Sequence, residues 1–361
     1  MEQRWPISKS QVNKAGEILR SDEPDIFLEV EAVDLIARWR ATYSGPLRSV
    51  TSILRRAATQ INRGAVVSNR LKRMDSITAK LKRPQTATLK LASMQDIAGC
   101  RAVMWHVGEV HQLVAKYSRL VGESPNSLSD YIQNPKSDGY RGIHFVIRYA
   151  GKNPRFSSWV GKDIEVQVRS TLQHAWATAV ETVDLFSTQR LKFGEGDPRW
   201  RRFFALASTV FAKFEASPIV ACTPDEDEEL RKELKKLYSQ LNVLSLLQGW
   251  ATAAGHLPVV LQGVITEGSP PASVFILMVN LTQSNVYINP YPPDRIDEAN
   301  AEYASLEEEI RNGKLSQVVL VSVEDVEQLR AAFPNFYADT SQFLRSIEEF
   351  LSAYRYRIIT E

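Results

Sequence analysis

The sequence predicts an α/β (α+β) protein in which a mixed β-sheet is flanked by helices and a second, smaller α+β domain follows. Between residues 96 and 216, segments with the period of strands alternate with segments with the period of helices. Residues 217–228 then combine two prolines with an acidic run, which is typical of a domain boundary. We therefore predict one domain at 1–216 and another at 217–361.

The first sixty residues are predicted to be helical. An extended segment from residue 65 leads into a helix that Asp75 or Ser76 caps and that carries Ile77 and Leu81 on its apolar side. Before it, apolar residues recur at three- and four-residue spacings, and we expect them to be packing positions. These residues are Ile26, Phe27, Val30, Val33, Leu35, Ile36 and Trp39.

The next hundred residues supply the sheet and the helices beside it. In order, we predict strand 96–104, helix 107–120, loop 129–142, strands 142–149 and 163–169, a helix through 172–180 capped by Ser170, and helix 199–216. In the strand at 163–169, Glu165, Gln167 and Arg169 alternate with apolar residues. The sheet should therefore have one polar face.

The last third of the chain is predicted to be α+β. In order, we predict a long helix from the acidic residues 225–229 to about 254, an apolar run at 259–264, strands 274–281 and 285–289 joined as a hairpin, helix 297–311, strand 317–323, and helices 326–332 and 341–354.

Composition excludes several classes of protein. The chain is 44% hydrophobic and 24% charged with a net charge of +2, as in ordinary globular proteins. The longest uncharged apolar runs are too short to span a bilayer, and the first twenty residues lack an apolar signal segment. Two cysteines and five histidines do not support a disulfide framework or a zinc site. We expect a cytoplasmic protein that binds neither membranes nor DNA.

The near-neutral total hides a division of charge. Residues 1–215 hold 33 Lys and Arg against 21 Asp and Glu, a net +12, whereas residues 216–361 hold 11 against 21, a net −10. A basic half favours ligands that carry phosphate, and an acidic half could cover the same surface in their absence. The alternative is that two domains simply differ in composition.

A group of cations around a short helix is a candidate phosphate site. Arg70 and Lys72 share a face of an extended segment. Lys80 lies one helical turn beyond Ser76, and Arg83 lies at the neighbouring step beyond Lys80. Four converging cations would repel one another unless an anion such as a triphosphate lay among them. A solvated basic helix face is the alternative that spacing alone leaves open.

Two acids are candidate ligands for a divalent cation. Asp96 begins one predicted strand, and Glu165 lies on the polar face of another. Magnesium takes oxygen ligands and is commonly held by one or two carboxylates together with substrate phosphates. Each acid taken singly could instead be solvated or salt-bridged, because sequence cannot prove that the two strands are neighbours.

The loop at 136–142 has the features of a nucleotide-binding loop. Tyr140 lies between two glycines and beside the cations Lys136 and Arg141, which supplies a stacking ring and positive charge on flexible backbone. His144 and His174 could donate to a phosphate or a base edge. The alternatives are a turn with a packed aromatic ring and two structural histidines.

Four segments in this order resemble one known family, the RelA/SpoT-type alarmone synthetase domain. They are Arg70-Leu-Lys72 with Ser76-Ile-Thr-Ala-Lys80, Asp96-Ile-Ala-Gly-Cys-Arg101, the stretch from Asp130 to His144 with its Gly139-Tyr140-Arg141-Gly142, and Glu165-Val-Gln167-Val-Arg169. The resemblance covers residues 45–215 and implies the RelA/SpoT synthetase fold. It also implies transfer of pyrophosphate from ATP to a nucleotide 3′-hydroxyl, with release of AMP.

The resemblance further implies a role for each candidate residue. Arg70 would hold the adenine side of ATP, and Lys72, Lys80 and Arg83 would hold its phosphates near Ser76, with Lys136 and Arg141 also on the nucleotide side. Asp96 and Glu165 would bind Mg²⁺, and Glu165 would help to deprotonate the attacking hydroxyl. Tyr140 would stack on the acceptor base, and His144, Gln167, Arg169 and His174 would line the acceptor side.

Two acceptors remain open. Ordinary members of the family use GDP or GTP and make (p)ppGpp. The segment from Gln173 to Thr182 and the acidic C-terminal extension resemble toxic small alarmone synthetases instead. Members of that branch can modify the 3′-CCA end of tRNA and stop translation, and a +12 domain would favour contact with tRNA phosphates.

The C-terminal segment resembles the tail of CapRel-type fused toxin–antitoxin proteins, whose domain is described as a pseudo-zinc finger. In that group a Tyr-x-x-Tyr motif blocks the nucleotide pocket, and a phage protein such as the capsid protein relieves the block. Here Phe333 and Phe336 take the tyrosine positions, and Tyr337 follows directly. These three residues are therefore predicted to be autoinhibitory. The alternative is that the phenylalanines anchor a terminal helix in its own core.

Overall fold

A computed structural model describes residues 7–23, 25–72, 74–121, 127–151, 159–187, 191, 196–251, 274–280, 285–311, 317–322 and 340–352. The chain forms two compact units, of which the first contains residues 1–131 and 142–171 and the second contains residues 132–141 and 172–361. This division differs from the predicted one because the loop at 132–141 and two helices before residue 216 pack with later elements. The functional division at 216 stays a prediction.

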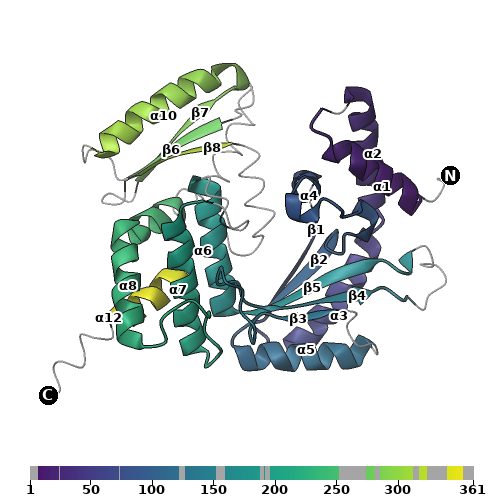
Figure 1. Ribbon diagram of the computed structural model, residues 1–361, viewed down its shortest axis with the longest axis horizontal. Coiled ribbons are helices and arrows are strands. Elements are labelled where there is room, and N and C mark those ends of the chain that lie inside the picture. The colour runs from purple at the N-terminus through teal and green to yellow at the C-terminus, as the bar shows by residue number, and fades with distance from the viewer. Residues whose placement is uncertain are drawn as a thin grey trace. The chain divides into compact units, whose positions relative to one another are not determined.

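The first unit is built on a five-stranded sheet with the order β1-β2-β5-β4-β3 (Figure 1). The strands are β1 (Val66–Leu71), β2 (Ala98–Met104), β3 (Leu128–Asp130), β4 (Ile143–Arg148) and β5 (Asp163–Ser170). The pair β2 and β5 is parallel, and the other neighbours are antiparallel. The predicted mixed sheet flanked by helices is therefore confirmed.

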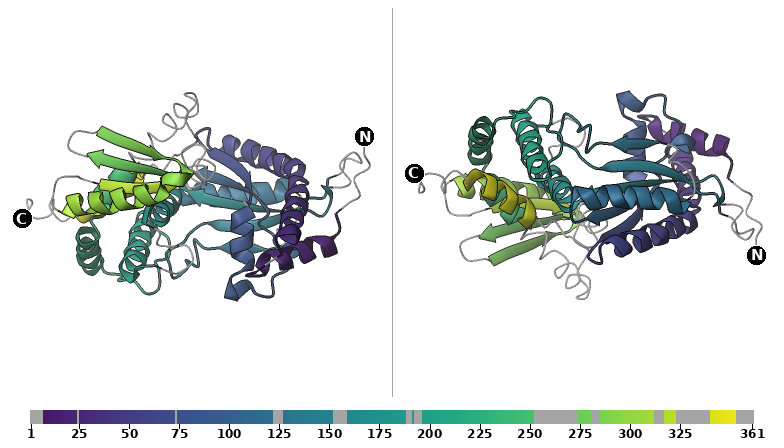
Figure 2. Two further views of the ribbon diagram at one scale, coloured as in Figure 1. Left: turned by 90° about the horizontal axis from the view of Figure 1, so that it is seen from above. Right: turned by 90° about the horizontal axis from the view of Figure 1, so that it is seen from below.

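Helices surround this sheet. They are α1 (Lys9–Arg20), α2 (Ile26–Ala41), α3 (Ser44–Ile61), α4 (Met74–Leu81) and α5 (Val107–Val121), with short 3₁₀ turns at Pro84–Thr86 and Leu91–Ser93. Helices α3 and α5 pack against the sheet (Figure 2). The Tyr117 ring of α5 lies 5.8 Å from the Phe145 ring of β4, and its hydroxyl donates to Val50 O of α3 at 3.3 Å. One face of the sheet is thus closed by an apolar layer.

Helix α2 is oriented differently from the expectation. Asp25 caps its first turn, and the buried stripe consists of Ala32, Ile36 and Trp39. Ile26 and Phe27, predicted as packing positions, are 74% and 83% exposed, and Val30 and Val33 are exposed as well. The packing prediction was wrong for these residues because the apolar positions of the helix form two stripes, of which only the later one faces the core.

Two local boundaries also differ. Helix α4 begins at Met74, so Asp75 and Ser76 lie inside its first turn instead of capping it, although Ile77 and Leu81 are buried as predicted. The start of the predicted loop at 129–142 belongs to strand β3, which pairs with β4 through Ser129 opposite His144.

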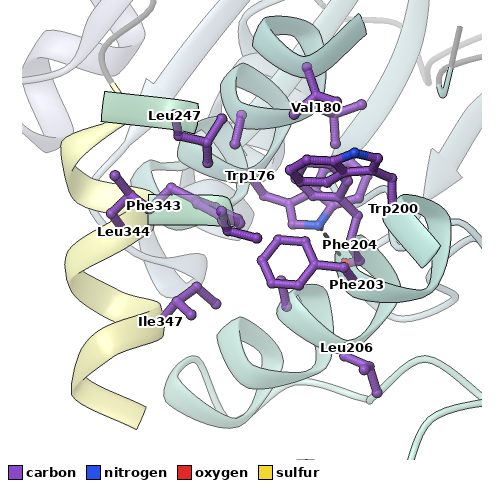
Figure 3. Packing of buried hydrophobic residues seen from close by; sticks show 14 of the residues in the cluster. Trp176, Val180, Trp200, Phe203, Phe204, Leu206, Leu247, Phe343, Leu344 and Ile347 are labelled. Carbon is purple, nitrogen blue, oxygen red and sulfur yellow. Dashed lines mark hydrogen bonds between the residues drawn. The ribbon is translucent and has the colours of Figure 1, made fainter. Parts of the chain in front are cut away.

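The second unit contains a helical core. Its helices are α6 (Thr171–Ser187, in this unit from Leu172), α7 (Pro198–Phe214), α8 (Asp227–Gln240), a helical stretch at 243–251 and α12 (Ser341–Ser352). Figure 3 shows buried rings of this core, among them Phe343 of α12 and Phe204 of α7. The centroid of the Phe343 ring lies 5.8 Å from that of Phe204 and 5.5 Å from that of Phe211, also of α7. The C-terminal helix is therefore an integral part of this core.

The predicted helix from the acidic residues to about 254 is interrupted. Helix α8 ends at Gln240, and Asn242 adopts a φ of +48°, which asparagine tolerates better than most residues. Helical conformation resumes at 243. The apolar pattern continues across the break because Leu237, Leu241 and Val243 are all buried.

A small antiparallel sheet completes the described part of the second unit. Its strands are β6 (Val274–Asn280), β7 (Asn285–Tyr291) and β8 (Gln317–Ser322), in the order β7-β6-β8. Between β7 and β8, the chain forms a 3₁₀ turn at Pro293–Arg295 and helix α10 (Ile296–Arg311). The predicted hairpin, strand and helix are confirmed. The predicted elements at 259–264 and 326–332, and the residues Phe333, Phe336 and Tyr337, lie outside the described residues. Within the described residues, every helix is too short or too polar to cross a membrane.

Candidate active site

The polar face of the first sheet gathers the strand residues that the sequence singled out. Glu165 of β5 lies opposite Gly99 of β2, and Gln167 lies between Arg101 of β2 and His144 of β4. Directly paired residues of neighbouring strands project their side chains to the same face. Ile164, Val166 and Val168 are fully buried on the other face. The predicted alternation is confirmed, and it places one carboxylate, one amide and one imidazole side by side.

Hydrogen bonds link these side chains into a chain. Arg169 Nη2 donates to Gln167 Oε1 at 3.1 Å, and Gln167 Nε2 donates to Glu165 Oε2 at 2.9 Å. His144 Nδ1 lies 3.3 Å from Glu165 Oε1, and the Tyr131 ring meets the imidazole edge-on at 5.5 Å. Each oxygen of Glu165 is thereby oriented by a different neighbour.

These neighbours keep Glu165 ionised. Burial favours its neutral form and is the largest influence on its pKa, but the hydrogen bond and charge of His144 and the hydrogen bond of Gln167 act in the opposite direction. The net result is a pKa below the ordinary value of 4.5, despite a raising contribution from the charge of Asp96. A carboxylate that is charged at neutral pH can accept a proton or bind a cation.

Asp96 holds two of the predicted cations. Its Oδ2 lies 2.8 Å from Lys72 Nζ and 3.0 Å from Lys80 Nζ, and the three side chains are 20–27% exposed. Lys72 is fixed because its backbone N–H donates to Ile97 O at 2.7 Å, which extends the pairing of β1 with β2 by one residue. Lys80 comes from the last turn of α4. A strand end, a helix end and the residues before β2 therefore converge on one carboxylate.

The charge state of Asp96 follows from the same contacts. Burial is the largest influence and raises the pKa, but the charges and hydrogen bonds of Lys72 and Lys80 together lower it below the ordinary value of 3.8. Its second oxygen, Oδ1, is buried and has no hydrogen-bond partner within the described part of the chain. One oxygen of this ionised carboxylate therefore has an acceptor capacity that the described residues do not use.

The two acids fit a magnesium site that a substrate completes. Asp96 precedes β2 and Glu165 lies on the adjacent strand β5, and the charge of Asp96 raises the pKa of Glu165. The described residues contain no cluster of three or more His, Cys, Asp and Glu side chains that could hold a metal alone. Two carboxylates, one of which has an oxygen (Asp96 Oδ1) without a hydrogen-bond partner among the described residues, suit Mg²⁺. This cation keeps several waters and takes its remaining ligands from phosphates.

The other predicted phosphate ligands of this unit lie nearby in the chain. Arg70 is exposed on β1 opposite Gly99, and Ser76 is exposed on α4. Arg83 is half-buried just after α4. Their predicted roles toward ATP stay predictions.

Tyr140, Lys136 and His174 belong to the second unit. The Tyr140 ring is half-buried and meets the Trp176 ring edge-on at 6.4 Å, while Lys136 Nζ lies 5.1 Å from its centroid. His174 is half-buried in the first turns of α6. The carboxylates belong to the first unit, so the contact of all these residues with one acceptor stays a prediction.

Arg141 differs from its predicted phosphate-binding role. It is 3% exposed, and its guanidinium donates to Ser208 Oγ at 2.9 Å, Pro218 O at 2.6 Å and Ile132 O at 3.3 Å. Burial lowers the pKa of Arg141 to about 10, an effect that the charge of Glu215 opposes. The side chain remains charged at neutral pH, but protein oxygens engage it, and it has almost no surface for a phosphate.

Sequence reasoning missed Arg101 as a member of the site. It lies on β2 directly opposite Ser68 of β1 and Gln167 of β5, on the same polar face as Glu165. The signal was present, because Arg101 is two residues beyond Gly99 and so shares its face. Only the register of β2 against β5 shows that this face of β2 is the one beside Glu165.

Comparison with known proteins supports one family for part of the chain. Residues 69–185 match the family described as "Region found in RelA / SpoT proteins". The GTP pyrophosphokinase YjbM of Bacillus subtilis (strain 168) is 30% identical over 116 residues, which are 31% of this chain and 52% of that protein. A probable chloroplastic GTP diphosphokinase of Arabidopsis thaliana is 30% identical over 112 residues, which are 31% of this chain and 14% of the relative.

Two solved structures are similar to about half of the chain. The small alarmone synthetase 1 of Bacillus subtilis, in a crystal structure bound to its product pppGpp, is 22% identical with a TM-score of 0.41, covering 50% of this chain and 92% of that one. A GTP pyrophosphokinase family protein from Streptococcus pneumoniae is 20% identical with a TM-score of 0.39, covering 50% and 89% of the two chains. The curated relatives are thus matched over about half their length or less.

Proposed function

We propose that the protein is a pyrophosphokinase of the RelA/SpoT type, which transfers a diphosphate group from ATP to the 3′-hydroxyl of a nucleotide acceptor. The match of residues 69–185 supports this proposal. The observation that carries it is the presence of two ionised carboxylates, Asp96 beside two lysines just before β2 and Glu165 beside His144 and Gln167 on the adjacent strand β5.

The chemistry requires positioning and charge neutralisation more than covalent catalysis. The acceptor oxygen attacks the β-phosphorus of ATP, the bond from that phosphorus to the bridging oxygen breaks, and AMP leaves with the bridging oxygen. Glu165 is ionised and has both carboxylate oxygens oriented by its neighbours, and it accepts the proton of the hydroxyl. Arg169 holds Gln167, which in turn holds Glu165.

The lysines change partners when the substrate binds. Lys72 and Lys80 neutralise Asp96 in the structure described here and would transfer part of that contact to the phosphates of ATP, with Arg70 and Arg83 contributing further positive charge. Glu165 and Asp96 would hold Mg²⁺, the latter through Oδ1, which has no hydrogen-bond partner among the described residues. The metal would neutralise the charge that develops on the phosphate oxygens.

GDP or GTP is the acceptor that the named relatives favour, because YjbM is a GTP pyrophosphokinase. The net charge of +12 over residues 1–215 supports the other candidate, the 3′-CCA end of tRNA. Tyr140 would stack on the acceptor base in either case, with His144 and His174 on the acceptor side.

One assay separates the acceptors. Purified full-length protein is incubated with Mg²⁺, γ-labelled ATP, and either GDP, GTP or deacylated tRNA, and the products are resolved by size. We expect label to move from ATP to one acceptor class together with an equal amount of AMP. Label in nucleotide alone would exclude tRNA, and no transfer to any acceptor would contradict the proposed reaction.

The C-terminal domain at 217–361 is proposed to inhibit the enzyme until a phage protein, such as a capsid protein, binds it. The resemblance of the segment around Phe333, Phe336 and Tyr337 to the CapRel tail supports this, as does its acidic composition. The double variant Phe333→Ala and Phe336→Ala should be toxic on expression without phage, and adding Glu165→Ala should restore growth. Normal growth with the double variant clearly expressed would argue against autoinhibition.

A further inference from the structure

The loop at 132–141 is fastened to the helical core by two buried polar side chains. The Ser208 hydroxyl of α7 donates to Gly139 O at 2.7 Å and accepts from Arg141 Nε at 2.9 Å. The same guanidinium reaches Ile132 O, at the other end of the loop, and Pro218 O, just after α7. Arg141 therefore ties both ends of the loop to each other and to the scaffold.

The backbone of this loop also fits tightly against the helices. Gly139 has a φ of +97°, and a Cβ atom there would lie 2.9 Å from both Ser208 Cβ and Trp176 Cζ2. Only glycine combines that conformation with so close an approach. The Trp176 ring beside Gly139 is itself held in place, because its Nε1 donates to Phe204 O at 2.8 Å (Figure 3).

Hydrogen bonds between residues close in sequence complete the loop around Tyr140. Gly139 N–H donates to Lys136 O at 2.9 Å, and Lys136 N–H donates to Tyr140 O at 3.2 Å. The backbone N–H of Tyr140 donates to Asp138 Oδ1 at 2.8 Å. The position of the Tyr140 ring is thus set by a closed loop whose outer anchors are Ser208 and Arg141.

We propose that Ser208 and Arg141 are positioning residues for acceptor binding, which hold the loop so that Tyr140 is already placed for the acceptor base. This inference rests on the proposed function for the identity of the ligand. Neither residue touches the acceptor in this scheme. A preorganised loop saves the ordering entropy that a mobile one would lose on binding, so loosening it should weaken acceptor binding and leave ATP binding unchanged.

Ser208→Ala tests the proposal, and Thr209→Val is its matched control. Thr209 is the next residue of α7 and is equally buried, but its hydroxyl contacts Thr223 Oγ1 at 2.6 Å and Val220 N–H at 3.3 Å instead of the loop. We expect Ser208→Ala to raise the KM for the acceptor about tenfold, the size of one lost hydrogen bond to a charged group. The KM for ATP should stay within about twofold. Thr209→Val should change neither value, even if both variants lower the melting temperature.

Two further measurements show whether Ser208 acts through Tyr140, and neither of them requires the enzyme to be active. In a Tyr140→Leu background, Ser208→Ala should add little further loss of acceptor binding, as coupled residues do in a double-mutant cycle. Hydrogen exchange of the amides at 139 and 140 should accelerate in Ser208→Ala and not in Thr209→Val.

The two levels of the proposal fail differently. If the wild-type protein transfers label to no acceptor, the proposed function is contradicted, and the exchange data alone decide whether Ser208 holds the loop. An unchanged acceptor KM in an active, folded Ser208→Ala protein overturns the positioning role, as does an equal rise in both KM values. Unchanged exchange at 139 and 140 overturns the loop anchor itself.

Discussion

Two groups of cations that the sequence treated alike have opposite surroundings. Lys72 and Lys80 of the first unit are about one quarter exposed, and both contact the single carboxylate oxygen Asp96 Oδ2. Arg141 of the second unit is almost fully buried, and its partners are neutral carbonyl and hydroxyl oxygens. The two lysines can therefore change their ionic partner at a partly exposed site, whereas Arg141 stabilises the fold through buried hydrogen bonds.

The difference shows what a binding cation needs. A lysine paired with a carboxylate at a partly exposed site can move to a phosphate, because water and the incoming anion can reach it. A buried arginine whose donors are satisfied would lose those bonds before it could form others, and each buried oxygen left behind would be unsatisfied. Positive charge near a site is therefore evidence for binding only when it can be reached.

The largest effect expected within this comparison is on catalysis in the first unit. Glu165→Gln keeps the size of the side chain but removes the proton acceptor, and we expect kcat to fall about 10³-fold, within the range for loss of a general base. Steady-state kinetics measures the change. Asp163→Asn is the control, since it removes a carboxylate two residues earlier on the same strand that contacts Arg148. Equal losses in both variants would show that β5 as a whole, and not Glu165, had been damaged.

The next prediction concerns stability in the second unit. Arg141→Met should lower the free energy of unfolding by about 3 kcal/mol, because Ser208 and two carbonyl oxygens lose a buried partner. Lys80→Met should cost less than about 1 kcal/mol, since its ion pair is partly exposed. Urea denaturation of both variants measures the difference. Similar values for the two would remove the distinction between a structural and an exchangeable cation.

Lys72→Gln sharpens the functional side of the comparison. The variant removes a charge that is proposed to contact ATP phosphates, and we expect the KM for ATP to rise about tenfold, as for loss of a hydrogen bond to a charged group. The KM for the acceptor should change little. Lys116→Gln on α5 provides a control for loss of one positive charge from the same unit. If the two lysine variants behave alike, the contact with Asp96 does not mark a nucleotide site.

The smallest expected effect is on the pH dependence of stability. The pKa values of Asp96 and Glu165 are lower in the folded chain than their ordinary values of 3.8 and 4.5. Their ionised forms therefore stabilise the fold above those ordinary values, and this stabilisation is lost as the pH falls through the lower folded values. Unfolding free energies measured from pH 6 to pH 3 should fall more steeply for the wild type than for Asp96→Asn with Glu165→Gln. Parallel curves would contradict the assigned contacts.

Much of the fold could be read from local patterns. The alternation in 163–169 identified β5 and its polar face, and the spacing in 107–120 identified α5. The break at Asn242 was missed because the apolar pattern continues across it, and the exposure of Phe27 was missed because two apolar stripes share one helix. In both cases local periodicity could not show which positions the rest of the chain covers.

The candidate site was predictable as a set of residues but not as a set of contacts. Local periodicity was enough to assign Asp96, Glu165 and the lysines to the ends or the polar sides of their elements, since side-chain direction follows the backbone period. The parallel pairing of β2 with β5 depends on the folded chain, and it sets Glu165 opposite Gly99, three residues after Asp96. The tertiary structure also decided that Arg141 is enclosed, because burial and partners depend on segments far away in the chain, such as Ser208 and Pro218.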